Sequence, residues 1–426
     1  MNTYKVSILT VGDEILIGQT VNTNAAKIGQ IVSSLGAEIV ASSVCPDNKE
    51  AMLVELERLE NISDSIIITG GLGPTHDDIT KSVLTEYYDD ETVVNEEELI
   101  RIKEYFKIRK REFKDINIEL ARIPNKCLPI RNNVGTAPGM HFPDSSSKKN
   151  VDVFSLPGVP REMMAMMEEY VASYIESQLD NSYDVQAFRT IETSGRGESD
   201  LADLIGSVDS FLKSNTSLAY LPSTRGVRLR LGAIGKFEET EKELDELEKL
   251  IESKVGQFIV GKGDADKKST IKELLDKQKL SVSVAESCTS GLLGAYLTEI
   301  SGSSSYFKGG ILSYSNEVKK SLLSVKEYTL EQYGAVSEET AREMADGCRV
   351  LLGTDISISI TGIAGSGGGT DEKPVGLVWV ALSDSKGIIA KRFNFGRSRE
   401  TNRELAVSAA TNMLLLRLKE NYEGKE

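Results

Sequence analysis

The stretch Ser65-Ile-Ile-Ile-Thr-Gly-Gly-Leu-Gly-Pro-Thr-His-Asp-Asp-Ile-Thr80 joins a β-branched run to a glycine-rich turn and then to a helical pattern. The run Ser65–Thr69 predicts a short strand, and the residues after Asp77 predict a helix. The same alternation surrounds it, with strands predicted at 6–10 and 38–44 and helices at 22–35 and 48–60. Strands that alternate with helices indicate a mainly parallel sheet with helices on both faces. We therefore expect an α/β domain over residues 1–172.

Two further segments follow this domain. Residues 180–260 follow the order β-α-β-β-α-β, with helices predicted at 198–212 and 237–254 and a last strand at 256–260, which is the order of a small α+β domain. The run Gly261–Lys268 has the composition of a linker. Residues 266–426 return to a mixed α/β pattern that closes with a helix. The chain is thus predicted to hold three domains, 1–172, 180–260 and 266–426.

The composition limits the classes of function. A chain of 426 residues is too long for one ordinary core. A formal charge of −15 argues against a protein built to hold nucleic acid, although a local basic patch is compatible with it. No apolar run of about 18 residues occurs, so no membrane span is expected. The four cysteines lie far apart, as expected for reduced thiols in the cytoplasm.

The first candidate site combines glycines with carboxylates. Gly12 follows the first predicted strand, and Gly70, Gly71 and Gly73 follow the third. Ligands bind where strands end in an α/β sheet, and glycines let backbone N–H groups approach phosphate oxygens. The neighbouring carboxylates are of the type that holds a hard divalent cation; they are Asp13, Glu14, Asp77 and Asp78. For either motif alone, a tight turn with a capping Asp is an equally good interpretation.

The second candidate site has to work without histidine, because both histidines, His76 and His141, lie in the first third of the chain. Ala285-Glu-Ser-Cys-Thr-Ser-Gly291 lies at a strand-to-helix junction, where Ser287 or Thr289 is equally typical of a helix N-cap. Cys288 has no histidine to hold it as a thiolate, so we expect a packed, unreactive residue.

A serine nucleophile then needs a lysine base, and the candidates are Lys319 and Lys320 in the polar stretch Ser301–Lys320. Only roughly one lysine in 2,500 is neutral at pH 7 when its pKa is unperturbed. Desolvation has to supply a pKa shift of about 3 units. Burial of Lys319 is therefore a test of this hypothesis.

Two more motifs lie in the last segment. The glycine-rich run Thr361-Gly-Ile-Ala-Gly-Ser-Gly-Gly-Gly-Thr370 suits a phosphate or an oxyanion, or else forms a flexible hairpin loop. Gly396-Arg-Ser-Arg-Glu-Thr-Asn-Arg403 places three arginines at the start of the last helix. Arginines there are unfavourable unless an anion balances them, which favours a phosphorylated substrate; a solvated face is the alternative.

The N-terminal phrases Gly-Asp-Glu, Asn22-Thr-Asn24, Thr-Gly-Gly-Leu-Gly-Pro-Thr and Leu156-Pro-Gly-Val-Pro resemble the first half of the CinA family, which is similar to the MoaB/MogA molybdopterin-binding fold. This resemblance implies cleavage of ADP-ribose to AMP and ribose 5-phosphate with a divalent metal such as Mg²⁺. It implies metal ligands at Asp78, Asp13 and Glu14, a further polar contribution from Asp47, and substrate contacts at Asn24, Gly70, Gly71 and Gly73.

The middle segment resembles a module called KH-like. Its Gly232-Ala-Ile-Gly235 ends a predicted strand and does not join two helices, so we expect no RNA binding.

The C-terminal phrases Ala-Glu-Ser-Cys-Thr, Gly-Ser-Ser, Tyr-Ser-Asn-Glu, Thr-Gly-Ile-Ala-Gly and Lys-Pro-Val-Gly resemble the CinA C-terminal domain, whose stand-alone form is a nicotinamide mononucleotide deamidase. The resemblance implies Ser304 as nucleophile, Lys319 as base and no cofactor. It implies assisting hydroxyls at Ser287 and Tyr314, and substrate contacts at Thr361, Gly362, Gly365, Thr289 and Arg399. Ser290 and Ser366 depart from the family, which has glycine and proline there.

The expectation is therefore a cytoplasmic enzyme of pyridine-nucleotide salvage that hydrolyses nicotinamide mononucleotide and ADP-ribose. Its partners would be these small nucleotides and a second copy of the chain, with no nucleic acid and no membrane. The alternative of a different class is a binding module, molybdopterin-like or nucleotide-binding, that has one of these activities or neither.

Overall fold

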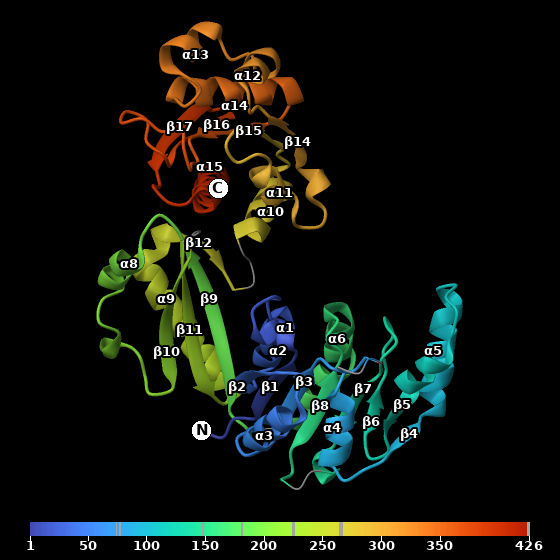
Figure 1. Ribbon diagram of the computed structural model, residues 1–426. Helices are drawn as coiled ribbons and strands as arrows, with labels where there is room; N and C mark the ends of the chain where they lie inside the picture. Colours follow the sequence, from blue (N-terminus) through green and yellow to red (C-terminus); the bar gives the residue numbers. More distant parts are fainter. Residues whose placement is uncertain are drawn as a thin grey trace. The chain divides into compact units, whose positions relative to one another are not determined.

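The computed structural model describes residues 1–73, 75, 78–146, 149–179, 182–223, 226–263 and 267–423 (Figure 1). The predicted cation ligand Asp77 and the residue His76 lie outside the described residues. The chain divides into two compact units. Unit 1 comprises Met1–Phe188 and Gly232–Asp245, and unit 2 comprises Arg189–Leu231 and Glu246–Glu426.

Unit 1 contains a six-stranded sheet of order β2-β1-β3-β8-β7-β6. Strand β1 pairs in parallel with β2 and β3, and β3 pairs in parallel with β8, whereas β7 is antiparallel to β8 and β6. The predicted mainly parallel sheet is therefore confirmed. The strands are β1 Lys5–Val11, β2 Glu38–Cys45, β3 Ser65–Thr69, β6 Leu128–Ile130, β7 Gly139–Phe142 and β8 Asp152–Leu156.

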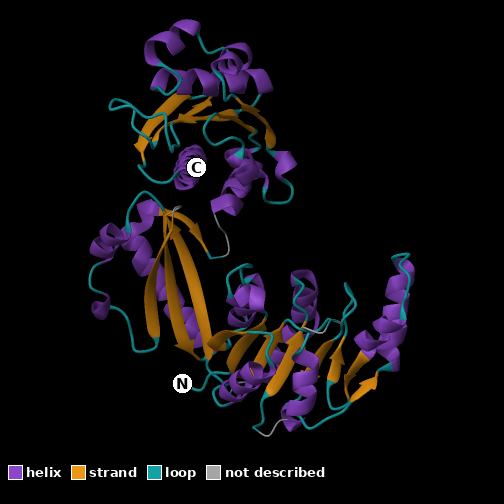
Figure 2. Ribbon diagram, viewed as in Figure 1, coloured by secondary structure: helices purple, strands orange, loops and turns teal. Residues whose placement is uncertain are grey.

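Helices cover both faces of this sheet (Figure 2). Along β3 the side chains alternate between the two layers, with Ile66 and Ile68 in one apolar cluster and Ile67 in the other. Both faces are buried, which is why β3 is apolar at consecutive positions. The helices are α1 Asp13–Leu16, α2 Thr23–Ser34, α3 Lys49–Glu60, α4 Thr80–Tyr87, α5 Glu96–Ile108, α6 Pro160–Met166 and α7 Ala172–Gln178, and a small ladder joins β4 Thr92–Val94 to β5 Arg122–Pro124.

A four-stranded sheet of order β10-β11-β9-β12 follows in the chain, and the predicted order β-α-β-β-α-β is confirmed. The helix predicted at 198–212 is too long, because it ends at Ile205 before Gly206, whose φ is +81°. The motif Gly232–Gly235 does end a strand. The elements are β9 Val185–Thr193, α8 Glu198–Ile205, β10 Thr216–Ser223, β11 Gly226–Gly235, α9 Phe237–Val255 and β12 Ile259–Lys262.

The predicted linker 261–268 is wrong at both ends. Gly261 and Lys262 belong to β12, where Gly261 pairs with Glu192 of β9. Helix α10, Lys267–Gln278, begins with a lysine that is 3% exposed. Strand pairing and burial are tertiary effects, and a polar, glycine-containing composition does not reveal them.

Unit 2 also contains a five-stranded sheet of order β14-β13-β15-β16-β17. Strand β13 is parallel to both of its neighbours, β14 and β15, and the last two strands are antiparallel. Helix α14 packs on one face through Ala341 and Ala345, and α15 packs on the other. The elements are β13 Val282–Glu286, α11 Leu292–Thr298, β14 Phe307–Leu312, α12 Asn316–Leu323, α13 Glu327–Tyr333, α14 Glu338–Leu352, β15 Ile356–Gly362, β16 Leu377–Asp384, β17 Gly387–Asn394 and α15 Arg399–Glu423.

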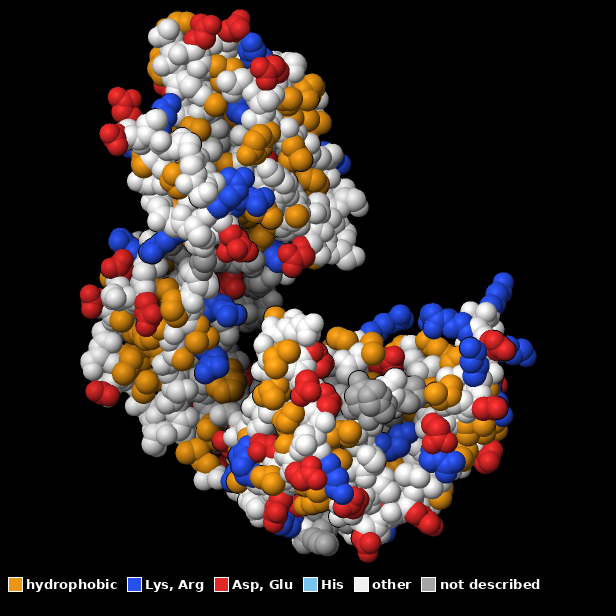
Figure 3. Space-filling model, viewed as in Figure 1, with side chains coloured by type: hydrophobic (Ala, Val, Ile, Leu, Met, Phe, Trp, Pro, Cys, Tyr) orange, Lys and Arg blue, Asp and Glu red, His pale blue; other side chains and the backbone are white. Residues whose placement is uncertain are grey.

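The surface of unit 1 carries a local basic region despite the negative net charge. Basic side chains gather at the end of α5 (Figure 3), where Lys107, Arg109, Lys110 and Arg111 are all exposed. The guanidinium of Arg109 lies 5.1 Å from the ring centroid of Tyr105. Across the described residues, no helix combines the length and the hydropathy that a membrane crossing requires.

Candidate functional sites

The six-stranded sheet of unit 1 and the five-stranded sheet of unit 2 share one topology at their first strands. In each, the first strand of the sheet lies between the second and the third, giving the order β2-β1-β3 in unit 1 and β14-β13-β15 in unit 2. Chain connections diverge to the two sides at this point, and the crevice beyond the carboxyl ends of the strands is where such sheets bind ligands. The predicted motifs follow these strands in both units.

In unit 2, Lys319 and Ser287 meet beyond the carboxyl ends of β13 and β14. Ser287 directly follows β13, and α12 brings Lys319 back to it. The Lys319 Nζ atom lies 3.2 Å from Ser287 Oγ and donates to the carbonyl oxygen of Ser313 at 2.7 Å. Lys319 is 1% exposed, and this burial lowers the pKa of its amine. The predicted burial of Lys319 is confirmed.

The pairing of Ser304 with Lys319 is wrong. Ser304 is exposed in a 3₁₀ turn, Ser303–Ser305, that precedes β14, whereas Lys319 contacts Ser313, which follows β14. Six residues of strand separate the two ends, a span of about 20 Å. Ser287 therefore takes the position beside the lysine that the resemblance gave to Ser304.

The other hydroxyl and lysine of the stretch lie outside this pair. Tyr314 is 64% exposed, and the atom that approaches Lys319 Nζ, at 3.5 Å, is its carbonyl oxygen. An assisting role for the Tyr314 phenol has no contact to support it in this conformation. Lys320 forms an ion pair with Glu327 at 2.8 Å, and its side chain is 39% exposed. Lys319 is thus the lysine of this stretch that reaches a serine.

The turn after β13 is held by a carboxylate, not by a serine cap. The N-cap residue of helix α11 is Gly291, which has no side chain that could accept a hydrogen bond from the first turn. The buried carboxylate of Glu286 instead accepts hydrogen bonds from three backbone N–H groups, those of Gly291, Leu293 and Gly294, at 3.0, 3.1 and 2.9 Å. Negative charge is favourable at a helix N-terminus. The N-cap interpretation of Ser287 and Thr289 is therefore not realised.

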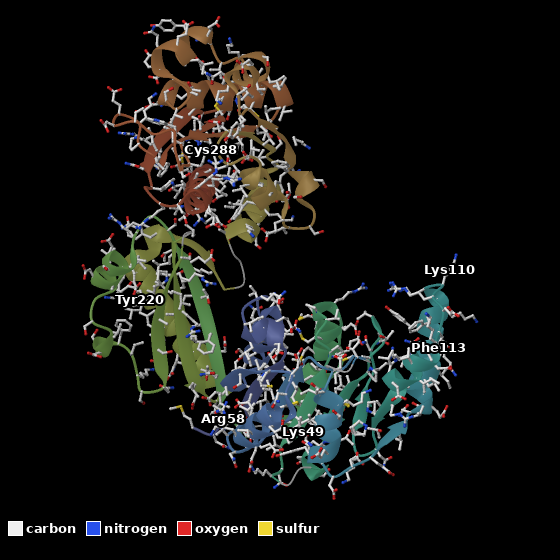
Figure 4. The ribbon with its side chains drawn as sticks, in the orientation of Figure 1. Lys49, Arg58, Lys110, Phe113, Tyr220 and Cys288 are labelled. Carbon is white, nitrogen blue, oxygen red and sulfur yellow. The ribbon has the colours of Figure 1, made fainter. Side chains whose placement is uncertain are left out.

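Backbone donors are available beside Ser287. Within the described part of the chain, the N–H groups of Cys288 and Thr289 donate no hydrogen bond to an oxygen atom. Two adjacent N–H groups next to a nucleophile are the usual donors of an oxyanion hole. The thiol of Cys288 (Figure 4) is 6% exposed, and burial raises its pKa to about 11, so the predicted inert, packed cysteine is confirmed.

The start of α15 ties two turns together. Arg399 donates to the carbonyl oxygen of Gly365, and Arg403 donates to that of Thr289 at 2.9 Å. The Oγ1 atom of Thr289 and the Nε atom of Arg403 are buried without a hydrogen-bond partner among the described residues. Buried polar atoms without partners are uncommon in proteins, and these two lie next to the nucleophile turn. Sequence reasoning missed the roles of Glu286 and Arg403.

The remaining predicted residues of this site lie nearby. The hydroxyl of Thr361 donates to the carbonyl oxygen of Ala335 at 2.6 Å, so its substrate contact stays a prediction. Gly362 ends β15, and a Cβ there would stand 2.7 Å from the Leu377 carbonyl oxygen. Ser290, which replaces the family glycine, adopts a φ of +49°, a conformation that suits glycine better.

Unit 1 has a cavity of about 480 Å³ where β1, β3 and β8 end. The glycines predicted to bind substrate form its wall, and a Cβ at any of them would meet neighbouring atoms. A Cβ at Gly70, Gly71 or Gly73 would stand 2.2 to 2.4 Å from Val11 O, Thr80 Oγ1 or Asp78 Oδ2. Gly70 and Gly71 also have φ angles of +112° and +67°. This turn therefore demands glycine for both conformation and space.

Asn24 lies in the same cavity and is 8% exposed. Its amide nitrogen donates to Thr69 Oγ1 at 3.0 Å and to the carbonyl oxygen of Gly158 at 2.8 Å. Its Oδ1 atom is buried without a hydrogen-bond partner among the described residues. An acceptor oriented by two hydrogen bonds and left unsatisfied is consistent with the predicted ligand contact.

The charge of this cavity is negative. Among the described lining residues, four are carboxylates and none is a lysine or arginine; the carboxylates are Glu14, Asp47, Asp78 and Glu162. Asp13 is exposed and does not line the cavity; its backbone N–H donates to Asp47 Oδ2 at 3.0 Å. Across the described ranges, no three Asp, Glu, His or Cys side chains gather closely enough to hold a metal ion by themselves.

Comparison with known proteins adds the family. Three family models match: the probable molybdopterin binding domain at residues 7–177, the damage-inducible protein CinA KH domain at 188–261, and the CinA C-terminal domain at 264–418. Fold and matched segments together define an α/β protein of the competence- and damage-inducible class. The chain belongs to the CinA family.

Two relatives that match along most of the chain support this assignment. A CinA-like protein of Salinibacter ruber is 39% identical over 406 residues, which cover 95% of this chain and 97% of the relative. A putative competence-damage inducible protein of Halothermothrix orenii is 38% identical over 418 residues, which cover 98% and 99%. The solved structure of the competence/damage inducible protein CihA from Agrobacterium tumefaciens is 39% identical with a TM-score of 0.34, and covers 35% of this chain and 96% of that one. None of these three names states a substrate.

Proposed function

We propose that unit 2 hydrolyses the carboxamide of nicotinamide mononucleotide, giving nicotinate mononucleotide and ammonia. The observation that carries this proposal is the contact of 3.2 Å between Lys319 Nζ and Ser287 Oγ. A buried lysine with a lowered pKa is a base that a serine hydroxyl can use where histidine is absent. The choice of substrate rests on the resemblance of residues 269–420 to the deamidase family.

The reaction proceeds in two halves. Neutral Lys319 takes the proton of Ser287, and Ser287 Oγ attacks the carboxamide carbon. The N–H groups of Cys288 and Thr289 stabilise the oxyanion that forms. The C–N bond then breaks, and ammonia leaves with the proton that Lys319 returns. Water attacks the resulting ester and Lys319 takes a proton from it. As the ester C–O bond breaks, Lys319 returns this proton to Ser287 Oγ, and nicotinate mononucleotide is released.

The glycine-rich turn and the start of α15 supply the phosphate subsite in this proposal. Arg399 and Arg403 lie one helical turn apart at the N-terminal end of a 25-residue helix. Like charges at this spacing repel each other, and positive charge at a helix N-terminus is unfavourable. A bound phosphate removes both costs, which favours a phosphorylated substrate over free nicotinamide.

The test compares two serines. We expect Ser287→Ala to lower ammonia release from nicotinamide mononucleotide by at least 1,000-fold, the order of loss seen when a catalytic nucleophile is removed. Ser304→Ala is the matched control and should stay within about twofold of wild type. Product identity is checked by chromatography. Full activity in Ser287→Ala, or loss in Ser304→Ala alone, would contradict the assignment of the nucleophile.

For unit 1, we propose divalent-metal-dependent hydrolysis of ADP-ribose to AMP and ribose 5-phosphate. The supporting observation is the cavity of about 480 Å³ whose described wall has four carboxylates and no cationic side chain. A diphosphate is repelled by such a wall unless a divalent cation neutralises it. Mg²⁺ is commonly held by one or two carboxylates together with substrate phosphates, so a complete protein cage is not required.

The carboxylates of Asp78 and Glu14 are the residues that would hold the ion, with Asp47 beside them. The metal would neutralise charge on the phosphates and polarise the scissile bond. The residues of this chain supply the rest: the Gly70–Gly73 turn offers backbone N–H groups, and Asn24 Oδ1 offers an acceptor.

The experiment is incubation with ADP-ribose, with and without Mg²⁺, followed by identification of AMP. Asp78→Ala should abolish turnover, and Glu86→Ala, an exposed substitution on α4, is the control. Binding of ADP-ribose without any turnover would instead favour the rival function, a nucleotide-binding module.

A further inference from the structure

Part of the lining of the unit 1 cavity received no role in the sequence analysis. Thr136 and Ala137, from the loop Asn132–Ala137, line it together with Glu162, the third residue of α6. Glu162 is separate from the proposed metal ligands in the chain, since it follows β8 while Glu14 and Asp78 follow β1 and β3. Its role needs its own explanation.

Glu162 is held in place by Asn132. The amide nitrogen of Asn132 donates to Glu162 Oε2 at 2.6 Å and to the carbonyl oxygen of Ala137 at 2.8 Å, while its Oδ1 accepts from the N–H of Val134 at 3.1 Å. Asn132 is 1% exposed, so its side chain is fixed by burial and by three hydrogen bonds. The geometry leaves Glu162 one oxygen, Oε1, without a hydrogen-bond partner among the described residues.

The loop is built to admit this carboxylate. A Cβ at Gly135 would stand 2.1 Å from the carboxyl carbon of Glu162, so any other residue there would displace it. The loop is fixed from outside the cavity by Arg101 of α5, which donates to the carbonyl oxygens of Asn132, Gly135 and Thr136 at 2.5, 3.0 and 2.8 Å. Arg101 also pairs with Glu98 at 2.7 Å, and both side chains are almost buried.

We propose that Glu162 is a specificity-determining residue of this cavity, whose carboxylate accepts hydrogen bonds from the hydroxyl groups of a ribose, and that Arg101 is its positioning residue. A carboxylate repels phosphate but is a strong acceptor for neutral donors. In a nucleotide the ribose hydroxyls are such donors. This inference rests on the nucleotide proposed for the cavity, and it adds which part of that ligand Glu162 recognises.

The test compares two ligands that share only the diphosphate. Calorimetry with Mg²⁺ measures two affinities for wild type and Glu162→Gln. The first is for the methylene-bridged analogue of ADP-ribose, which cannot be cleaved between its phosphorus atoms and stands for ADP-ribose below, and the second is for inorganic pyrophosphate. In the variant, the side-chain oxygen still accepts from Asn132, so the NH₂ group turns toward the ligand and cannot accept a hydroxyl proton. We expect ADP-ribose affinity to fall by about 10- to 100-fold, as for loss of a hydrogen bond to a charged group, with pyrophosphate affinity within twofold.

Two further variants guard against a purely structural effect. Arg101→Lys keeps the charge beside Glu98 but loses the fork that holds three carbonyls, and should lower ADP-ribose affinity selectively but less. Glu168→Gln, at an exposed position just beyond α6, should leave the affinity for both ligands unchanged.

Each outcome decides the matter. Equal weakening of both ligands would assign Glu162 to the phosphates or the metal and overturn the proposal, as would unchanged ADP-ribose affinity in Glu162→Gln. Normal ADP-ribose binding with abolished turnover would make Glu162 a catalytic residue instead. If wild type bound neither ligand, the proposed function of unit 1 would fail together with this inference.

Discussion

The amine of Lys319 lies 3.2 Å from the hydroxyl of Ser287, although 32 residues separate them in the chain. The direction of strand β14 makes this contact possible. Because β14 runs parallel to β13, the residues that follow β14 lie at the same edge of the sheet as Ser287. Burial of the amine lowers its pKa and favours the neutral base.

The deamidase reaction should depend on pH through this lysine. Because the pKa of Lys319 is lowered, the neutral fraction, and with it kcat/KM for nicotinamide mononucleotide, should rise with pH and level off below the ordinary lysine pKa of about 10.4. Lys319→Arg should be inactive, because arginine keeps its proton. Profiles of kcat/KM from pH 5 to 10 check this. A flat profile across this range would count against Lys319 as the base.

The same lysine should impose a pH-dependent cost on stability. A lysine whose pKa is lower in the folded than in the unfolded state binds fewer protons when folded. The free energy of unfolding therefore rises with pH, from the lowered pKa up to about 10.4. Lys319→Met has no titrating group at this position, so its free energy of unfolding should exceed that of wild type at pH 6. The difference between the two proteins should be smaller at pH 10. Thermal unfolding at the two pH values tests this, and an identical difference at both would refute it.

Glu286 should contribute strongly to the stability of unit 2. Its carboxylate accepts three backbone N–H groups, whereas glutamine would present an NH₂ group to at least one of them. We expect Glu286→Gln to lower the free energy of unfolding by about 2–3 kcal/mol. Glu299→Gln, which removes an exposed carboxylate paired with Lys268, should cost less than about 1 kcal/mol. Urea titrations followed by circular dichroism give both values.

Gly347 should resist substitution for reasons of space. A Cβ there would lie 1.9 Å from the carbonyl oxygen of Leu323, so α12 and α14 touch through this glycine. Gly347→Ala should destabilise the fold by about 1–3 kcal/mol and, because α12 carries Lys319, also reduce deamidase activity. The control is Gly256→Ala, where no atom lies within 4 Å of the new Cβ. Equal stability of the two variants would contradict this packing.

Ser290 should be improved by the family residue. A φ of +49° destabilises the folded state by about 1–2 kcal/mol for a residue other than glycine. Glycine removes this strain, but it also increases the conformational entropy of the unfolded chain, which offsets part of the gain. Ser290→Gly should therefore raise the free energy of unfolding by about 0.5–1 kcal/mol, whereas Ser290→Ala should not. Parallel thermal denaturation of the two variants measures the difference.

More of the fold than of the candidate site could be predicted from the sequence. The period of apolar residues in Ser65–Thr69 and its neighbours predicts the parallel sheet, because local pattern and burial agree there. The absence of histidine after residue 141 leads correctly to a buried Lys319. The assignment of Ser304 came from the resemblance, which places motifs along the chain but not in space, and a whole strand separates Ser304 from the lysine.

Other contacts had no local signal. Arg101 reaches carbonyl oxygens 31 to 35 residues away, and backbone acceptors leave no mark on the sequence. Glu286 was overlooked because capping is usually sought in a serine or aspartate directly before the helix, and this carboxylate reaches N–H groups five to eight residues ahead.

The carboxylate of Glu286 has a consequence for the charge around Ser287. An anion adjacent in the chain to Ser287 would ordinarily attract a proton to the nearby amine and silence it as a base. Here the negative charge is balanced by three N–H dipoles at the start of α11, and the pKa of Lys319 is lowered by burial. Under the function proposed for unit 2, an uncharged carboxamide would enter a serine site that has no counter-ion to displace.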